Sequence, residues 1–334
     1  MPPSPKGALY PSPQGVMEVA YYFCSMTAVK NYLSLVKFSH TIFALPFALI
    51  GFVLGYNHFR GVAWFGDIYQ VQSKKFIAFN DLSGDGLLIK FLLVLACMVT
   101  ARSAAMAFNR YLDRSFDAKN PRTAIREIPR GIISPQSALR FVILNCILFI
   151  VACFFINKIC FFLSPVALFV VLFYSYTKRF TPLCHLVLGV GLSLAPIGAY
   201  LAVTGRFDVL PLLFSFAVIF WVSGFDIIYA LQDVEFDQSQ HLYSIPATIG
   251  KAKALRVSEL LHVLSATCVI SAGVYGHFHF VYWIGIAVFC GMLFYQHSIV
   301  KPNDLRRVNL AFMTANGIAS VVFGVLVIAD LFLN

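Results

Sequence analysis

Charged side chains are scarce in this sequence. Asp, Glu, Lys and Arg make up 12% of its 334 residues, and 59% of the residues are hydrophobic, whereas a soluble globular domain is usually about 25% charged. A chain of this length cannot hide so much apolar surface from water, so a soluble fold is excluded. The hydrocarbon core of a bilayer must be its solvent.

Patterns of metal-binding cysteines and histidines are also missing. The eight cysteines include no CxxC pair, and the eight histidines include no HxxxH or HExxH pattern. These absences argue against a zinc site. Because most cysteines fall within apolar runs, we interpret them as small apolar residues.

What the sequence does contain is a series of apolar runs, each about 17 to 22 residues long, which predicts an all-α membrane protein with about nine transmembrane helices. The predicted spans are 38–57, 87–108, 139–157, 160–176, 183–203, 208–229, 256–275, 279–297 and 309–331. Residues 1–30 begin with a Pro-, Ser- and Gly-rich stretch and lack the pattern of a signal peptide. We expect a disordered tail there, or sequence upstream of a start at Met17 or Met26, followed by a single transmembrane domain over 31–334.

Acidic residues gather in two stretches, each at the end of an apolar run. "NRYLDRSFDAKNPRT" from Asn109 contains Asp113 and Asp117, and "DIIYALQDVEFDQS" from Asp226 contains Asp233 and Asp237. The i, i+4 spacing places both carboxylates of each pair on one helical face. Charges beyond a membrane helix often serve only solvation and topology, but two such stretches with a shared face favour a site. Since Mg²⁺ prefers oxygen ligands and substrate phosphates, we predict that the stretches bind magnesium and a diphosphate.

Nearby cations are expected to bind the remaining diphosphate charge. The candidates are Lys178 and Arg179 in "YSYTKRFTP", Arg126 and Arg130 in "TAIREIPRG", and Lys37 at the start of the first span. For Lys37, contact with anionic lipid is an equally good interpretation.

The formal net charge is +10, and in a membrane protein an excess of Lys and Arg indicates which loops face the cytoplasm. With a cytoplasmic amino terminus, 18 of the 25 Lys and Arg residues fall in cytoplasmic segments. We therefore predict a multi-pass protein of the cytoplasmic (inner) membrane whose acidic stretches face the cytoplasm. Nucleic acid is not an expected partner.

Jointly, these residues resemble the UbiA-type intramembrane prenyltransferase superfamily, from about Leu33 to Leu331. The first family motif, N(D/R)xxDxxxD, is matched by Asn109, Arg110, Asp113 and Asp117; the second, DxxxD, by Asp233 and Asp237; a YxxxKR stretch by Tyr174, Lys178 and Arg179; and an Arg seven residues before the first motif by Arg102. Many members carry a third acid where this chain has Arg110, so the magnesium ligand set stays open.

The resemblance implies a nine-helix bundle around a central cavity that opens to lipid. It also implies Mg²⁺-dependent transfer of a polyprenyl group from a polyprenyl diphosphate to an aromatic acceptor. The metal ligands would be Asn109, Asp113, Asp117, Asp233 and Asp237.

An aromatic-substrate pocket is expected from Arg102, His40, Tyr174 and Asp226. An Arg inside a membrane helix should face the cavity, where its guanidinium can bind the carboxylate of an aromatic acid. Asp226 lies two turns deeper than Asp233 and is the candidate for orienting or deprotonating the phenol. The alternative is a structural ion pair between Asp226 and a cation such as Arg102. For His40, a purely structural role is equally good.

The acceptor is left open between two hydroxylated aromatic acids. "KFSHTIFALP" resembles a branch associated with the futalosine route to menaquinone, where the acceptor is 1,4-dihydroxy-6-naphthoate. The 4-hydroxybenzoate enzymes of ubiquinone biosynthesis are close relatives of that branch. Two alternatives are a multipass transporter, which would need polar groups near the bilayer midplane, and a haem- or chlorophyll-type prenyltransferase, which the setting of Arg102 disfavours.

Overall fold

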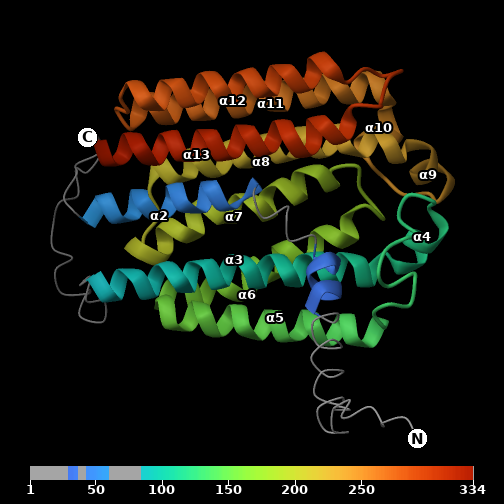
Figure 1. Ribbon diagram of the computed structural model, residues 1–334, viewed down its shortest axis with the longest axis horizontal. Coiled ribbons are helices and arrows are strands. Elements are labelled where there is room, and N and C mark those ends of the chain that lie inside the picture. The colour runs from blue at the N-terminus through green and yellow to red at the C-terminus, as the bar shows by residue number, and fades with distance from the viewer. Residues whose placement is uncertain (1–28, 37–42, 60–83, 334) are drawn as a thin grey trace, which may run out of the picture.

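The computed structural model describes residues 29–36, 43–59 and 84–333, and these are almost entirely helical (Figure 1). The long helices are α2 (Leu45–Phe59), α3 (Gly84–Leu112), α5 (Pro135–Ile156), α6 (Lys158–Thr177), α7 (Cys184–Thr204), α8 (Val209–Ala230), α11 (Lys251–Tyr275), α12 (Phe280–Ile299) and α13 (Asn316–Leu333). Between them lie α4 (Arg114–Lys119), η2 (Leu231–Asp233), α9 (Val234–Ser239), α10 (Ile245–Ile249) and a π-helical turn, η3 (Leu310–Ala315).

This arrangement confirms the all-α membrane architecture. Eight of the described helices are long and apolar enough to cross a bilayer, and a ninth apolar helix, Leu45–His58, is shorter. Each corresponds to one of the nine predicted spans. The first span was predicted from residue 38, but residues 37–42 lie outside the described part of the chain. Lys37, His40 and residues 1–28 of the predicted tail also lie outside the described part of the chain.

Local sequence signals set several helix ends. Ser134 accepts a hydrogen bond from the backbone N–H of Ser137, and Pro135 stands at the first position of α5, where its missing N–H costs nothing. Asn157 ends α5 and caps α6 by accepting from the N–H of Cys160. Gly205 ends α7 in the left-handed conformation, with φ of 67°, which glycine adopts without strain. Short caps of this kind fold consecutive spans into antiparallel neighbours.

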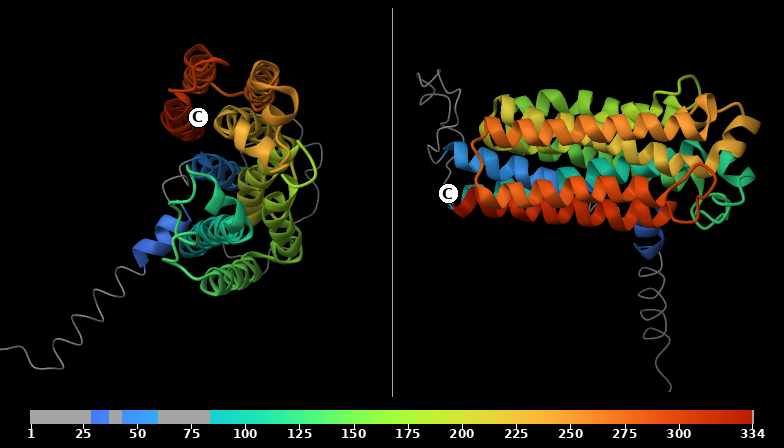
Figure 2. Two further views of the ribbon diagram at one scale, coloured as in Figure 1. Left: turned by 90° about the vertical axis from the view of Figure 1, so that its right-hand side faces the viewer. Right: turned by 90° about the horizontal axis from the view of Figure 1, so that it is seen from above.

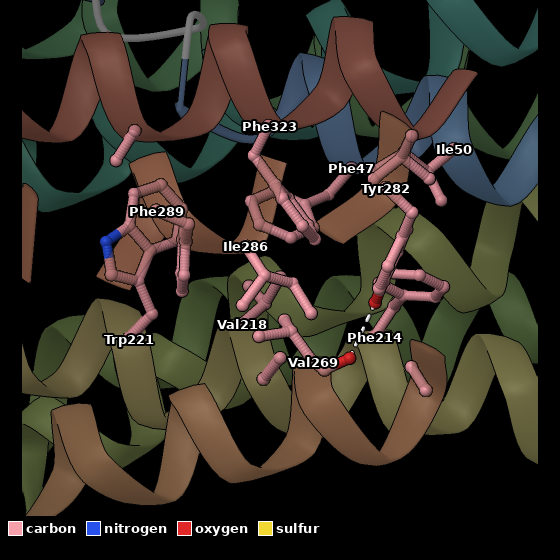
Figure 3. Packing of buried hydrophobic residues seen from close by; sticks show 14 of the residues in the cluster. Phe47, Ile50, Phe214, Val218, Trp221, Val269, Tyr282, Ile286, Phe289 and Phe323 are labelled. Carbon is pink, nitrogen blue, oxygen red and sulfur yellow. Dashed lines mark hydrogen bonds between the residues drawn. The ribbon is translucent and has the colours of Figure 1, made fainter. Parts of the chain in front are cut away.

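An aromatic core holds one side of the bundle together. Phe47 of α2, Phe214 and Trp221 of α8, Phe289 of α12 and Phe323 of α13 are fully buried. Figure 3 shows these rings packed against one another, and the ring centroids of Phe47 and Trp221 lie 5.3 Å apart. Ring pairs at such separations add to the burial of apolar area, so this side is densely packed.

The other side consists of α3, α5 and α6, with α2 and α7 between the two sides (Figure 1). The end-on view in Figure 2 shows the long helices lying side by side. Close approach of α2 and α7 depends on Gly51, where an added Cβ would lie 2.0 Å from the carbonyl oxygen of Pro196. The short helices α4 and α9 lie at the same end of the bundle, which brings the two acidic stretches together.

Candidate active site

The first acidic stretch begins where α3 ends. Asn109, in the last turn of α3, donates from Nδ2 to Oδ2 of Asp113 at 3.1 Å, so the amide and the carboxylate share a face as the spacing predicts. Arg179, just beyond α6, donates from Nη2 to Oδ1 of Asp113 at 2.9 Å and from Nη1 to the carbonyl of Ser175 at 3.0 Å. Burial raises the pKa of Asp113 above its usual value, although the charge of Arg179 opposes the shift.

Asp117 is held by a second arginine. Nη1 of Arg126 lies 2.6 Å from Oδ1 and 2.8 Å from Oδ2 of Asp117, and the Asp117 residue is only 6% exposed. The hydroxyl of Thr123 donates to the Asp117 carbonyl at 3.2 Å. The segment after α4 therefore folds back over the first carboxylate pair.

The same segment reaches the second acidic stretch. Arg122 donates from Nε to Oδ1 of Asp233 at 3.0 Å and from Nη2 to Oδ2, which makes a two-pronged ion pair. Asn120 donates to the same Oδ1 at 3.3 Å, and Nη1 of Arg122 donates to the hydroxyl of Tyr229 at 2.8 Å. The two acidic stretches thus lie in contact, as a shared magnesium and diphosphate site requires.

Asp237 is completely buried and has a lysine partner. Nζ of Lys178 lies 2.7 Å from Oδ1 of Asp237, and the hydroxyl of Ser244 donates to Oδ2 at 3.0 Å. Burial by itself lowers the pKa of Lys178, but the charge of Asp237 outweighs it and the pKa is raised. Lys178 is therefore held as a cation beside the second motif.

Each of the four motif aspartates is thus neutralised by a different cation. Three of these cations, Lys178, Arg179 and Arg126, are residues that the sequence assigned to the diphosphate. The fourth, Arg122, is not among the diphosphate cations that the sequence predicts. Its signal was its place inside the first quoted stretch, but nothing in the spacing shows that it reaches Asp233. Arg130 is exposed and is not among the four.

A cavity of about 390 Å³ lies among α3, α5, α6 and α7. Its wall is mostly apolar, and two polar groups stand out, the guanidinium of Arg102 and the side chain of Tyr174. Nε of Arg102 is buried and has no hydrogen-bond partner among the described residues. Tyr174 interacts electrostatically with Arg102, Asp113 and Asp226. This ring therefore lies between the cavity and the acidic motifs.

Asp226, in the last two turns of α8, has a partner that the sequence did not indicate. Nδ1 of His185 lies 2.7 Å from Oδ2 of Asp226. No ion pair joins Asp226 to Arg102 within the described residues; the partner of the carboxylate is His185 instead. A single histidine in an apolar run gave no signal of this contact.

Arg110 takes the place of the third acid found in many family members. It is 4% exposed, and its Nε and Nη1 atoms have no hydrogen-bond partner in the part of the chain that the structure describes. Its charge interacts with those of Arg126, Asp117 and Glu127. The guanidinium of Arg110 is therefore a further buried cation beside the site, in addition to the four that pair with the motif aspartates.

Comparison with known proteins agrees with this geometry. Residues 78–318 match the model of the UbiA prenyltransferase family. The 4-hydroxybenzoate octaprenyltransferase of Nitrosospira multiformis is 29% identical over 233 residues, which cover 69% of this chain and 79% of that protein. The enzyme of the same name from Tolumonas auensis is 28% identical over 238 residues, covering 71% of this chain and 83% of its own.

Solved structures show the same fold. A UbiA homolog from Aeropyrum pernix K1 superposes with a TM-score of 0.69 and 27% identity, covering 88% of this chain and 97% of that one. A UbiA homolog from Archaeoglobus fulgidus bound to GPP and Mg²⁺ has a TM-score of 0.63 and 19% identity, covering 90% and 99%. Since the family match spans well over half of the sequence, the chain belongs to the UbiA prenyltransferase family and is a polyprenyltransferase.

Proposed function

We propose that this chain transfers a polyprenyl group from a polyprenyl diphosphate to a ring carbon of a hydroxylated aromatic acid, with Mg²⁺, in quinone biosynthesis. The observation that carries the proposal is the convergence of the four aspartate–cation pairs beside a cavity that contains the unpartnered Nε of Arg102. Membership of the family argues against the transporter alternative.

The oxygen donors of the two motifs fit magnesium. Within the described residues no three His, Cys, Asp or Glu side chains are grouped tightly enough to hold a metal on their own. Mg²⁺ needs only one or two carboxylates and takes its other ligands from water and phosphate. We propose Asn109, Asp113, Asp117, Asp233 and Asp237 as the residues that hold it. When bound, magnesium would stabilise the negative charge that develops on the leaving diphosphate.

The four cations are proposed to bind the diphosphate. Lys178, Arg179, Arg126 and Arg122 already lie against the motif aspartates, and guanidinium groups match phosphate oxygens by two-pronged hydrogen bonding. Each of these cations also neutralises one motif carboxylate. Lys37 and Arg130 remain predicted diphosphate contacts that no contact described above supports.

The aromatic acid is proposed to bind at Arg102 and Asp226. The guanidinium of Arg102 would take the carboxylate of the acid, since its Nε is buried without a partner. Asp226 would orient the phenol and accept its proton. The allylic C–O bond breaks with its electron pair leaving on the diphosphate, and the ring carbon beside the phenol forms the new C–C bond. Tyr174 and His40 are proposed to complete the pocket.

The apolar cavity is proposed to receive the isoprenoid. Its lining is apolar enough to exclude water from an allylic cation, and the motif aspartates belong to the end of the bundle that is rich in Lys and Arg. That bias supports a site facing the cytoplasm in the inner membrane.

The two acceptor candidates have separate support. Relatives named 4-hydroxybenzoate octaprenyltransferase favour 4-hydroxybenzoate, whereas the stretch before α2 resembles the branch that uses 1,4-dihydroxy-6-naphthoate. The test is an assay in membranes with radiolabelled polyprenyl diphosphate, in which each acid is offered in turn.

We expect prenylated product with one of the acids, and loss of product on chelation or in Asp113→Ala. The matched control is Glu235→Gln, because Glu235 lies in the second stretch but its side chain is 73% exposed and pairs with Lys251. Full turnover in chelator, or in the Asp113 variant, would contradict the proposed metal ligands. Transfer to neither acid would refute the proposed acceptor class.

A further inference from the structure

His185 is a buried polar residue that the chemistry described so far does not use. It lies in the first turn of α7 and is 2% exposed. Both ring nitrogens face a partner: Nδ1 lies 2.7 Å from Oδ2 of Asp226, and Nε2 lies 3.4 Å from the backbone nitrogen of Ile245. A buried imidazole with two defined partners has a fixed orientation.

These partners also define where the ring proton resides. The backbone N–H of Ile245 can only donate, so Nε2 of His185 must accept. The proton of the neutral ring is then on Nδ1, which points at the carboxylate of Asp226. His185 therefore donates a hydrogen bond to Oδ2 and leaves the other oxygen, Oδ1, free of any donor among the described residues.

The surrounding helices keep this pair in register. The hydroxyl of Ser223, one turn before Asp226, donates to the carbonyl of His185 at 3.1 Å. At Gly189, one turn after the histidine, an added Cβ would lie 2.5 Å from the carbonyl of Ile219, so α7 and α8 are in close contact there. The donor and acceptor cannot drift apart without separating two packed backbones.

The pair is also connected to the second acidic motif. Ile245 follows Ser244, whose hydroxyl donates to Asp237 at 3.0 Å. The turn that fixes a proposed metal ligand therefore also supplies the N–H that fixes the imidazole. Asp226 itself is partly accessible, with 25% of its side chain exposed, and interacts electrostatically with Tyr174 at the cavity.

We propose that His185 is a positioning residue for the reaction, holding the carboxylate of Asp226 oriented so that Oδ1 accepts the phenolic proton of the aromatic acid. This inference rests on the role of Asp226 in the proposed function. The phenol O–H bond breaks, its electron pair stays on the phenolate oxygen, and the proton moves to Oδ1.

The remaining steps balance without any further reactant. When the ring carbon bonds to the allylic carbon, the phenolate becomes a dienone; the proton of that ring carbon then moves to the carbonyl oxygen and restores the aromatic phenol. Asp226 then releases its proton to water. His185 keeps the proton on Nδ1 throughout, so it orients the carboxylate and exchanges nothing with the substrate.

Three variants separate the two nitrogens of the ring. His185→Asn keeps an amide N–H near the place of Nδ1, His185→Gln keeps a polar group near the place of Nε2, and His185→Leu keeps neither. We expect the Asn variant to retain kcat close to that of the wild type. The Gln and Leu variants should lose about 10- to 100-fold in kcat, by analogy with the loss that follows removal of a hydrogen bond orienting a metal ligand. The KM for polyprenyl diphosphate should be unchanged in all three.

A second readout tests the proton transfer itself. A ring-fluorinated form of the acceptor ionises its phenol more readily, so the deficit of the Leu variant relative to wild type should shrink with that substrate. The matched control is His279→Leu, which removes an exposed histidine at the start of α12. Should the Leu variant not fold, the comparison of Asn with Gln decides the question alone.

The outcomes distinguish this inference from the proposed function. An inactive Asp226→Asn together with a fully active His185→Leu would overturn the role of His185 only. A fully active Asp226→Asn would refute the role of Asp226 and with it the inference. Equal losses in the Asn and Gln variants, or a loss confined to the KM for polyprenyl diphosphate, would also overturn the positioning role.

Discussion

The ion pair between Arg122 and Asp233 allows a quantitative test of how the two motifs are joined. We consider Arg122→Ala, Asp233→Ala and the double variant, in a double-mutant cycle for the free energy of unfolding. The side chain of Asp233 is 12% exposed and that of Arg122 is 33% exposed. Loss of one partner from a buried pair costs about 3–5 kcal/mol, whereas an exposed pair contributes about 0–1 kcal/mol. The partial exposure of Arg122 places the expected coupling between these limits, at about 1–3 kcal/mol.

The two single substitutions should differ in cost. Arg122→Ala leaves the more deeply buried carboxylate of Asp233 with only the 3.3 Å contact from Asn120, whereas Asp233→Ala leaves Arg122 bonded to Tyr229 and nearer to solvent. We therefore expect the arginine substitution to lower stability more. Denaturation in detergent micelles, without divalent metal, measures all four proteins.

A matched pair provides the control. Nζ of Lys251 lies 2.7 Å from Oε1 of Glu235, but the Glu235 side chain is 73% exposed. The coupling energy of this pair should therefore be below about 1 kcal/mol. If Arg122 and Asp233 prove no more strongly coupled than this control, the contact between the motifs does not hold them together. With Mg²⁺ and an unreactive prenyl diphosphate analogue present, the Arg122–Asp233 coupling should fall, because both side chains are then proposed to bind ligand.

Three further predictions follow from packing. Gly51→Ala should destabilise the protein by about 1–3 kcal/mol, because its Cβ would contact the Pro196 carbonyl; Gly198→Ala, with open space at the Cβ position, should not. Arg110→Met should raise the denaturation midpoint by removing unpartnered buried polar atoms, worth about 1–3 kcal/mol, and a lowered midpoint would contradict this. Ala167→Phe fills part of the cavity wall, so in competition assays it should lower kcat/KM for long polyprenyl diphosphates more than for short ones; an equal effect on both would argue against the cavity as the isoprenoid site.

The fold was largely predictable because its main signal is local. An apolar run of about 20 residues forms a helix long enough to cross a bilayer, so composition alone predicts each membrane helix. The i, i+4 spacing likewise predicted that Asn109 and Asp113 share a face, as their 3.1 Å contact shows. Each of these inferences needs only residues within one helix.

The pairing of charges was less predictable, because it depends on contacts between distant segments. Arg122 and Asp233 are 111 positions apart, and His185 and Asp226 are 41 positions apart on different helices. A single sequence records which residues are charged but not the path of the loop that carries them. Lys178 and Arg179 were named as nearby cations because they follow an apolar run on the predicted cytoplasmic side, but which aspartate each one contacts came only from the structure.

The division of the bundle into a packed side and a hollow side has an evolutionary consequence. The side chains of α12 and α13 that interlock with Phe47 and Trp221 contribute nothing to the wall of the cavity, which comes mainly from α3, α5, α6 and α7. Substitutions on α5 and α6 can therefore lengthen or shorten the room for a lipid tail while the aromatic rings opposite keep the helices in place. Members of a family with this fold can therefore differ in the length of the prenyl donor that they accept while keeping the same helix packing.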